Sequence, residues 1–234
     1  MNARLIRRPA APAPVAKEVA TGKGITPDSL PARLFLLACD PTTGRLAGRS
    51  HLGQLLRAAA LVDLQLTGHL VDEGGRAQVG TTKAPADPLL ASILEDIESS
   101  SPRKWRHWVD RRRRGIVREV RDDLERARLI KVERRRLLGI IPADRITLRH
   151  PLVRRQLLQA ATDTLRPARL VTRIDLRDAA LVVLAATADL RPVISKEQRN
   201  RHKDRLAQLA VRIGPVVPAL RKSIQAAAAA AAAG

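Results

Sequence analysis

The stretch from Gln54 to Leu70 is the feature that most constrains how this chain can fold. Apolar side chains lie on all sides of this predicted helix: Leu55, Leu56, Ala59, Ala60, Val62, Leu64 and Leu66. A helix that is apolar all round is buried in the core of a soluble protein. The run is interrupted by polar residues and is too short to span a bilayer, which needs about 20 apolar residues. The sequence therefore predicts a central core helix, ended by Gly68 in a left-handed conformation.

Arg57 is the charged residue in the first turns of this core helix. A buried guanidinium is costly unless it meets an anion or lies at a surface pocket. Two interpretations stay open at this point. Arg57 either extends to solvent or pairs with a nearby aspartate, or it faces a bound anion.

Composition narrows the class of partner. The 234 residues suit one large or two small domains, and their formal net charge is +20 with a pI near 11.6. Such a charge indicates a polyanionic partner, either nucleic acid or an anionic membrane. Aromatic residues make up 1% of the chain, which weighs against a sheet that stacks the bases of RNA or single strands. The single cysteine, Cys39, favours a reducing compartment, and the richness in Ala, Arg and Leu suits a high-GC bacterium.

Residues 1–30 are predicted to form a disordered arm. The arm is basic and rich in proline and alanine, a composition that cannot bury enough apolar surface to fold. Its start lacks the long apolar run of a signal peptide. We expect a helical domain over residues 31–215, followed by a C-terminal helix and polyalanine tail over residues 216–234.

Apolar residues at helical spacing predict most of the remaining elements. Helices are expected over residues 87–97, 116–128, 150–165, 175–188 and 195–213, with a final helix from Pro215 onward. A further helix is expected to start at Ser101-Pro102, and Trp105 and Trp108 are predicted to pack against the core. Strands are expected around the Gly74-Gly75 turn and over residues 129–133 and 145–148. The predicted fold class is therefore mostly α, with central hydrophobic helices surrounded by amphipathic helices and one or two β-hairpins.

The loop between the last two strands carries apolar residues beside a basic triplet, Arg134-Arg135-Arg136. The apolar residues of this tip are Leu137, Leu138, Ile140 and Ile141. Exposed apolar residues flanked by arginines are typical of membrane-binding surfaces. A long hairpin can equally pack on a neighbouring subunit, so membrane insertion and self-association both stay open.

Signatures of enzymes and metal sites are missing from the sequence. The histidines show no spacing typical of metal ligands, and the glycines form no phosphate-binding loop. Cys39 has no nearby histidine to activate it as a nucleophile. We therefore expect a protein that is not an enzyme and that has no metal and no cofactor.

Several segments stand in a characteristic order and spacing: Leu34–Leu37, Asp40–Gly44, Leu56–Leu70, Leu89–Ile97, Trp108, Arg118–Arg121, His150–Leu152 and Asp175–Ala188. This pattern resembles the Golgi phosphoprotein 3 domain family. The similarity covers about residues 30 to 215. The resemblance implies a central hydrophobic helix encircled by amphipathic helices, with β-hairpins. In eukaryotic members this domain binds phosphatidylinositol 4-phosphate and retains glycosyltransferases in the Golgi as an adaptor.

The resemblance also implies a pocket for the lipid head group. Its arginines correspond to Arg57 in the core helix and to Arg118 and Arg121 in an Arg-x-x-Arg helix. The tryptophan of the family pocket falls near Gly48, which is followed by Arg49, so that aromatic member is lost while the cationic pocket remains. The family hairpin, which mediates self-association near the membrane, corresponds to residues 129–148.

The chemistry of arginine agrees with this interpretation. Guanidinium groups clasp phosphates through short, charge-assisted bonds, and each further arginine adds about 1 kcal/mol near an anionic leaflet. Arg49 and Arg114 are accessory candidates for the pocket. We expect a peripheral membrane protein on the inner, cytoplasmic face of the membrane, which binds phosphatidylinositol 4-phosphate or other anionic lipids.

Partners follow from the same hypothesis. We expect an adaptor with membrane-protein cargo that forms a homo-oligomer through the 129–148 hairpin. Nucleic-acid binding is the alternative, because a basic helix over residues 116–128 followed by a hairpin resembles the helix and wing of a winged-helix module. Against it, the core helices are too apolar and too numerous for a small winged-helix module. A third hypothesis is that the protein is a non-enzymatic oligomeric scaffold.

Overall fold

A computed structural model describes residues 26–81, 83–134, 136–137, 141–142 and 144–233. The helices are α1 (Leu30–Ala38), α2 (Leu52–Leu66), α3 (Pro88–Glu98), α4 (Trp105–Asp110), α5 (Arg113–Arg126), α6 (Pro151–Leu165), α7 (Leu176–Thr187), α8 (Lys196–Arg201), α9 (Lys203–Ile213) and α10 (Val216–Ala232), with a 3-10 turn at Val171–Arg173. The strands are β1 (Leu70–Glu73), β2 (Arg76–Val79), β3 (Arg103–Lys104), β4 (Ile130–Glu133), β5 (Arg136–Leu137), β6 (Ile141–Pro142) and β7 (Arg145–Leu148). The mostly α fold class is confirmed.

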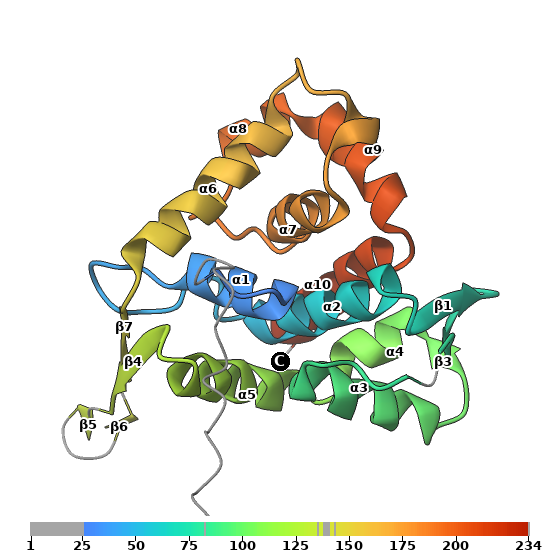
Figure 1. Ribbon diagram of the computed structural model, residues 1–234, viewed down its shortest axis with the longest axis horizontal. Helices are drawn as coiled ribbons and strands as arrows, with labels where there is room; N and C mark the ends of the chain where they lie inside the picture. The colour runs from blue at the N-terminus through green and yellow to red at the C-terminus, as the bar shows by residue number, and fades with distance from the viewer. Residues whose placement is uncertain (1–25, 82, 135, 138–140, 143, 234) are drawn as a thin grey trace, which may run out of the picture.

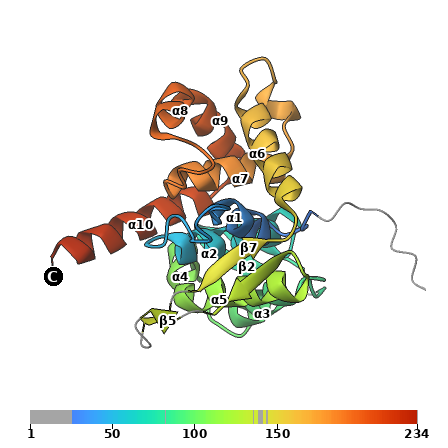
Figure 2. The same cartoon turned by 90° about the vertical axis from the view of Figure 1, so that its left-hand side faces the viewer.

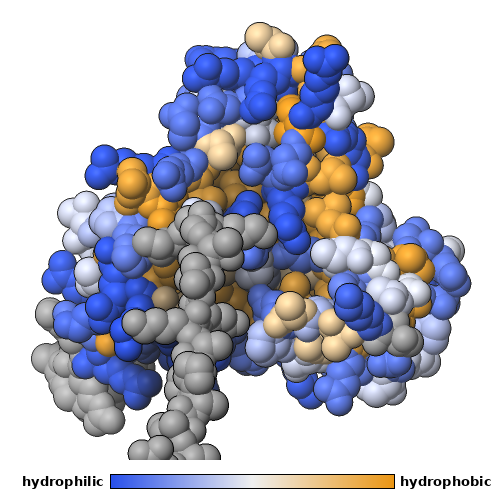
Figure 3. Space-filling view, viewed as in Figure 1, coloured by the Kyte–Doolittle hydropathy of each residue, from blue (hydrophilic) through white to orange (hydrophobic). Residues whose placement is uncertain are grey.

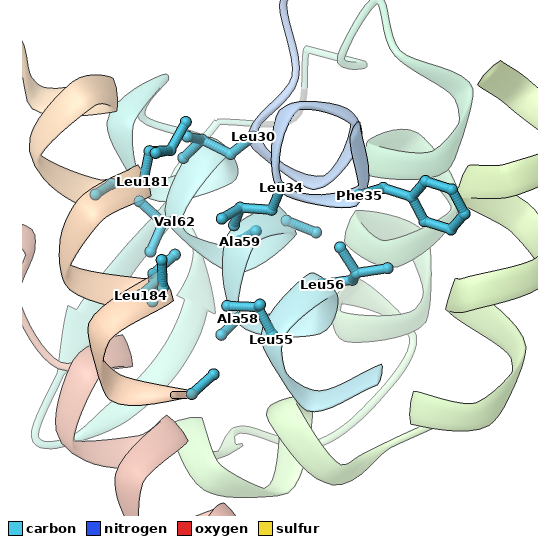
Figure 4. Close-up of a cluster of buried hydrophobic side chains, with 14 of the residues drawn as sticks. Leu30, Leu34, Phe35, Leu55, Leu56, Ala58, Ala59, Val62, Leu181 and Leu184 are labelled. Carbon is cyan, nitrogen blue, oxygen red and sulfur yellow. The ribbon is translucent and has the colours of Figure 1, made fainter. Parts of the chain in front are cut away.

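Helix α2 lies at the centre of the fold. Helix α1 packs on it, α3, α4 and α5 lie on one side, and α7 lies on the other (Figure 1). Side chains of α2 such as Leu56, Ala59 and Val62 meet those of α1 and α7 in the core (Figure 4). Gly68 has a positive φ of 76°. The predicted core helix and its left-handed end are therefore confirmed.

Helix α7 is the second core helix, as its apolar sequence predicts. The Asp175 carboxylate caps its first turn by accepting hydrogen bonds from the backbone N–H groups of Arg177 and Asp178 at 2.9 and 3.2 Å. Helices α6 and α9 pack against α7 (Figure 1). Hydrophilic residues cover much of the outline of the molecule, and hydrophobic ones show mainly toward the middle of this face (Figure 3).

Strands β1, β2 and β3 form an antiparallel sheet in that order. Gly74 and Gly75 both have positive φ, as the predicted two-residue hairpin turn requires. The prediction that a helix starts at Ser101-Pro102 is wrong. Residues Arg103 and Lys104 pair with β2 instead, so their backbone is extended and α4 begins only at Trp105. Trp105 and Trp108 are buried in the core, as predicted.

A second hairpin is formed by β4 and β7, with Ile130 opposite Leu148 in the register. Strands β5 and β6 continue it, and there Leu137 pairs with Ile141. The structure describes the backbone of those two tip residues but not their side chains. Leu138 and Ile140 lie outside the described residues, as do residues 1–25 of the predicted arm. Insertion of the tip into a membrane therefore stays a prediction.

The C-terminal third departs from the sequence prediction at one point. The capping box of Ser195 and Gln198 is present, but the single helix expected over residues 195–213 is divided at His202 into α8 and α9. Helix α10 then packs its first turns against α2 and α4. Its exposed alanine residues extend away from the body of the protein (Figure 2).

Cys39 follows α1 and is fully buried. Burial raises the pKa of its thiol to about 12, although the positive charge of Arg154 opposes the shift. The thiol is therefore protonated at neutral pH, which makes it a poor nucleophile.

A buried carboxylate ties the core helices together. Asp63 of α2 is 0% exposed. It accepts a hydrogen bond from the Leu30 backbone N–H at 2.6 Å and another from Nε of Arg177 at 3.2 Å. The Ser29 side chain does not cap α1, so Asp63 satisfies the first turn of that helix in its place. Burial raises the pKa of Asp63, and these two donors oppose the rise.

We expect Asp63→Ala to lower the free energy of unfolding by about 2–4 kcal/mol, because it leaves the Leu30 N–H and the Arg177 guanidinium without their acceptor. Urea denaturation measures this loss. The control is Asp163→Ala, which removes an exposed pair with Arg166 and should cost less than about 1 kcal/mol. Equal losses in the two variants would contradict a special role for Asp63.

Candidate anion-binding site

Helix α5 divides its side chains between the core and the surface. Ile116, Val120 and Leu124 recur at helical spacing and are buried. Arg114, Arg118 and Arg121 follow the same spacing on another face, because residues three and four apart are neighbours on a helix. The sequence of this helix thus places a row of guanidinium groups outside the core.

A cleft of about 370 Å³ lies beside this row. Its lining residues come from α5, from the loop between α1 and α2, and from β7 with the residue before it: Gly44, Leu46, Arg49, Arg114, Val117, Arg118, Arg121, Asp144 and Ile146. We call it the arginine cleft. Four cationic side chains and one carboxylate line it, so its charge favours an anionic ligand.

The arginines of the cleft differ in how they are paired. Within the described part of the chain, the side chains of Arg49, Arg114 and Arg118 have neither an ion pair nor a hydrogen bond. Arg121 donates to Asp122 through Nε and Nη2 at 3.0 and 2.9 Å, and to Asp144 through Nη1 at 2.9 Å. Three guanidinium groups are therefore free to bind an anion, while the fourth is partly neutralised.

The loop before α2 has glycine near the position where the resemblance predicts a tryptophan. Gly48 has a φ of 65°, a left-handed conformation that side chains with a Cβ rarely adopt. A tryptophan at this position would be strained in the present backbone. The next residue, Arg49, lines the cleft, so this loop supplies a cation to the site.

Arg57 does not line the arginine cleft. Its side chain is buried, with the residue 3% exposed, and its Nε donates to the carbonyl oxygen of Trp108 at 3.1 Å. Its Nη2 is buried and has no hydrogen-bond partner among the described residues. Burial lowers the pKa of Arg57 to about 10, and the charges of Asp96 and Glu119 oppose that shift, so the group is charged at neutral pH. Among the residues that the structure describes, no aspartate forms an ion pair with it.

The surroundings of Arg57 form a compact cluster. Arg111 donates to both carboxylate oxygens of Asp96 at 2.6 Å, and its guanidinium lies 5.6 Å from the centroid of the Trp108 ring. The bond from Arg111 is the main reason that the pKa of Asp96 lies below its usual range. The structure thus gathers Arg111 and Arg57 around Trp108 and leaves both outside the arginine cleft.

Sequence reasoning missed the carboxylates that occupy Arg121. Asp122 is its neighbour in the chain, a spacing that does not place two side chains face to face on a helix. Asp144 is 23 residues away and reaches Arg121 only because the β4–β7 hairpin folds back beside α5. No pattern in the sequence signals that contact.

A comparison with models of protein families shows the family to which this chain belongs. The family model described as Golgi phosphoprotein 3 (GPP34) matches residues 30–227. The chain belongs to this family. The match begins at α1 and ends within α10, so it includes every element of the arginine cleft. No curated protein matches the chain.

Within the part of the chain that the structure describes, no helix combines the length and apolarity needed to cross a membrane.

We expect Arg57→Met to leave the free energy of unfolding within about 1 kcal/mol of the wild type, or above it. The change removes a buried charge with an unpartnered donor and keeps an unbranched side chain. Urea denaturation tests this against Arg111→Met, which strips Asp96 of its partner and should cost about 1–2 kcal/mol. A loss of more than about 2 kcal/mol in Arg57→Met would show that the charge stabilises the fold.

Proposed function

We propose that this chain binds anionic lipid head groups in the arginine cleft and thereby associates peripherally with membranes. The ligands are phosphatidylinositol 4-phosphate or other acidic phospholipids. The observation that carries the proposal is the lining of the cleft, where three of four arginines lack a carboxylate partner among the residues that the structure describes. Membership of the Golgi phosphoprotein 3 family supports a lipid-binding adaptor at the family level.

The proposed binding rests on the physical chemistry of arginine. Its planar guanidinium forms bidentate, charge-assisted hydrogen bonds with phosphate oxygens. Arg114 and Arg118 lie one helical turn apart on the rigid α5, and Arg49 lies across from them on the loop. The backbone positions of these arginines are fixed by the fold, and their exposed side chains are accessible to a ligand. The remaining basic surface adds longer-range attraction that salt screens.

The wider role that we propose is that of a non-enzymatic adaptor. Membrane-protein cargo and self-association through residues 129–148 belong to the same proposal. The arginine cleft supplies the membrane contact, and β7, which contributes Ile146 to the cleft, also pairs with β4 in the hairpin. A ligand in the cleft would therefore lie next to the element proposed to mediate self-association.

Co-sedimentation with vesicles tests the lipid site. Wild type should bind vesicles that contain phosphatidylinositol 4-phosphate or phosphatidylglycerol, and should not bind neutral phosphatidylcholine alone. Arg118→Ala/Arg121→Ala should weaken binding about 30-fold, because each arginine near an anionic surface contributes about 1 kcal/mol. The control Arg155→Ala/Arg201→Ala removes the same charge from exposed positions on α6 and α8 and should bind like the wild type.

Two results would overturn this proposal. Equal weakening by both double variants would mean that binding depends on diffuse surface charge and not on the arginine cleft. Absence of binding to every anionic vesicle would refute the proposed lipid binding. Binding to duplex DNA with a steep salt dependence would then favour nucleic acid as the partner.

A second prediction concerns the carboxylate inside the cleft. Asp144→Asn should tighten binding to anionic vesicles about two- to fivefold, because it frees Nη1 of Arg121 and removes a negative charge. The side chains of this pair are 20% and 31% exposed, and partly exposed pairs of this kind contribute less than about 1 kcal/mol. Asp163→Asn, which neutralises a carboxylate on α6, serves as the control. Weaker binding of Asp144→Asn would mean that Asp144 positions Arg121 for the ligand.

A further inference from the structure

A separate cleft of about 370 Å³ lies among the helices of the C-terminal third, and we call it the C-terminal cleft. Its lining residues come from α7, α8, α9 and α10: Val183, Ala186, Thr187, Arg199, Lys203, Leu206, Ala207, Ala210, Val217 and Arg221. Figure 2 shows α8 and α9 above α10, and α7 packs against both α9 and α10. None of these residues lines the arginine cleft, so the two clefts are distinct.

The buried part of this lining is apolar. Val183 and Ala186 of α7, Leu206 of α9 and Val217 of α10 are each at most 9% exposed. The hydroxyl group of Thr187 donates to the Val183 carbonyl oxygen at 2.8 Å, so its proton is already used within α7. The C-terminal cleft therefore offers a ligand apolar surface from three helices.

Three cations line the C-terminal cleft, and none of the described residues in its lining is a carboxylate. Arg199 already has partners, because its Nη1 donates to Asp189 at 2.8 Å and to the Ala186 carbonyl oxygen at 3.4 Å. Lys203 and Arg221 are exposed, and over the described ranges their side chains have neither an ion pair nor a hydrogen bond. Two unpaired positive charges on different helices are therefore available to a ligand.

The size and composition of the C-terminal cleft are those of a small-molecule site. Such sites measure about 300–1,000 Å³, occur between packed helices and combine an apolar lining with a few polar groups. A protein partner needs about 20–30 residues on each side of its interface, whereas ten residues line this cleft. Apolar surface beside unpaired cations favours a ligand with an apolar chain and an anionic end.

We propose that the C-terminal cleft binds an acyl chain that ends in an anionic group, such as a long-chain carboxylate. The chain contacts the apolar side chains of α7, α9 and α10, and the anion binds to Lys203 and Arg221. This site is independent of the head-group binding proposed for the arginine cleft. A ligand of this chemistry comes from a free fatty acid or from an anionic lipid of the membrane, and the experiments distinguish the two sources.

Isothermal titration calorimetry of the full chain with sodium dodecanoate, below its micellar concentration, tests the site. Wild type should bind one dodecanoate per chain. It should bind dodecanoate at least tenfold more tightly than octanoate, because each methylene removed from water strengthens binding by up to about fourfold. Dodecyltrimethylammonium has a chain of the same length with a cationic end, and its binding should be undetectable because Lys203 and Arg221 repel it.

A double variant tests the cations. Lys203→Gln/Arg221→Gln should weaken dodecanoate binding about tenfold, since each exposed ion pair contributes up to about fivefold. The matched control, Lys196→Gln/Arg201→Gln, removes one lysine and one arginine from exposed positions of α8 that do not line the cleft. It should bind dodecanoate like the wild type.

A second variant tests the apolar chain. Ala207 lines the cleft and is exposed, so Ala207→Leu should weaken dodecanoate binding about tenfold by occupying space that the chain needs. Gln208→Leu, the control, adds a leucine at the next position of α9, which is exposed and does not line the cleft, and should have no effect. Circular dichroism with thermal unfolding verifies that all variants are folded.

Vesicles distinguish the two sources of the ligand. If the cleft binds a free fatty acid, Lys203→Gln/Arg221→Gln loses dodecanoate affinity and binds phosphatidylglycerol vesicles as tightly as Lys196→Gln/Arg201→Gln does. If it binds an anionic membrane lipid, the first double variant binds these vesicles more weakly than the control.

Three results would overturn this inference. Absence of dodecanoate binding to wild type would do so and would leave the head-group binding at the arginine cleft in place. Equal weakening by the cleft variants and their controls would mean that dodecanoate binds only adventitiously to the basic surface. Arg118→Ala/Arg121→Ala should keep the dodecanoate affinity of the wild type, and a loss in this variant would place the ligand in the arginine cleft instead.

Discussion

The burial of α2 from Gln54 to Leu64 is the constraint on which the rest of the structure depends. An apolar helix with no solvent-facing side must be covered on every face, and each polar side chain within it must find a partner in the element that covers it. Gln54 donates to Ser223 of α10, and Arg57 donates to the Trp108 carbonyl of α4. Asp63 joins α1 and α7. These polar contacts join α2 to the helices on its different faces.

The arginine cleft follows from this arrangement. Helix α5 covers α2 with one apolar face, so its arginines face outward, and Gly53 brings its first turn close to α2. The loop from α1 to α2 must cross the same end of the helix, and it carries Arg49 there. The site is therefore made where three chain segments meet at the edge of the core. Its charge is unbalanced because four arginines line it beside the single carboxylate of Asp144.

Periodicity and turn residues were sufficient to predict the two core helices, the capping box and both hairpins. The sequence could not predict the orientation of Arg57, because a helix that is apolar all round gives no indication of which neighbour each side chain faces. It also could not predict β3, since Arg103 and Lys104 become a strand only through pairing with β2. The pairing of Arg121 with Asp144 depends on how the hairpin folds back. Local chemistry thus predicted the elements, and long-range contacts decided the details of the site.

Because Cys39 is buried, the reactivity of its thiol reports local opening of the protein around it. A fully enclosed, protonated thiol reacts with an alkylating reagent only when the end of α1 separates from the core. The chain contains a single cysteine, so every modified molecule records the same local event. The rate of alkylation therefore measures the free energy of opening beside α2, and any ligand that binds only the closed protein must slow it.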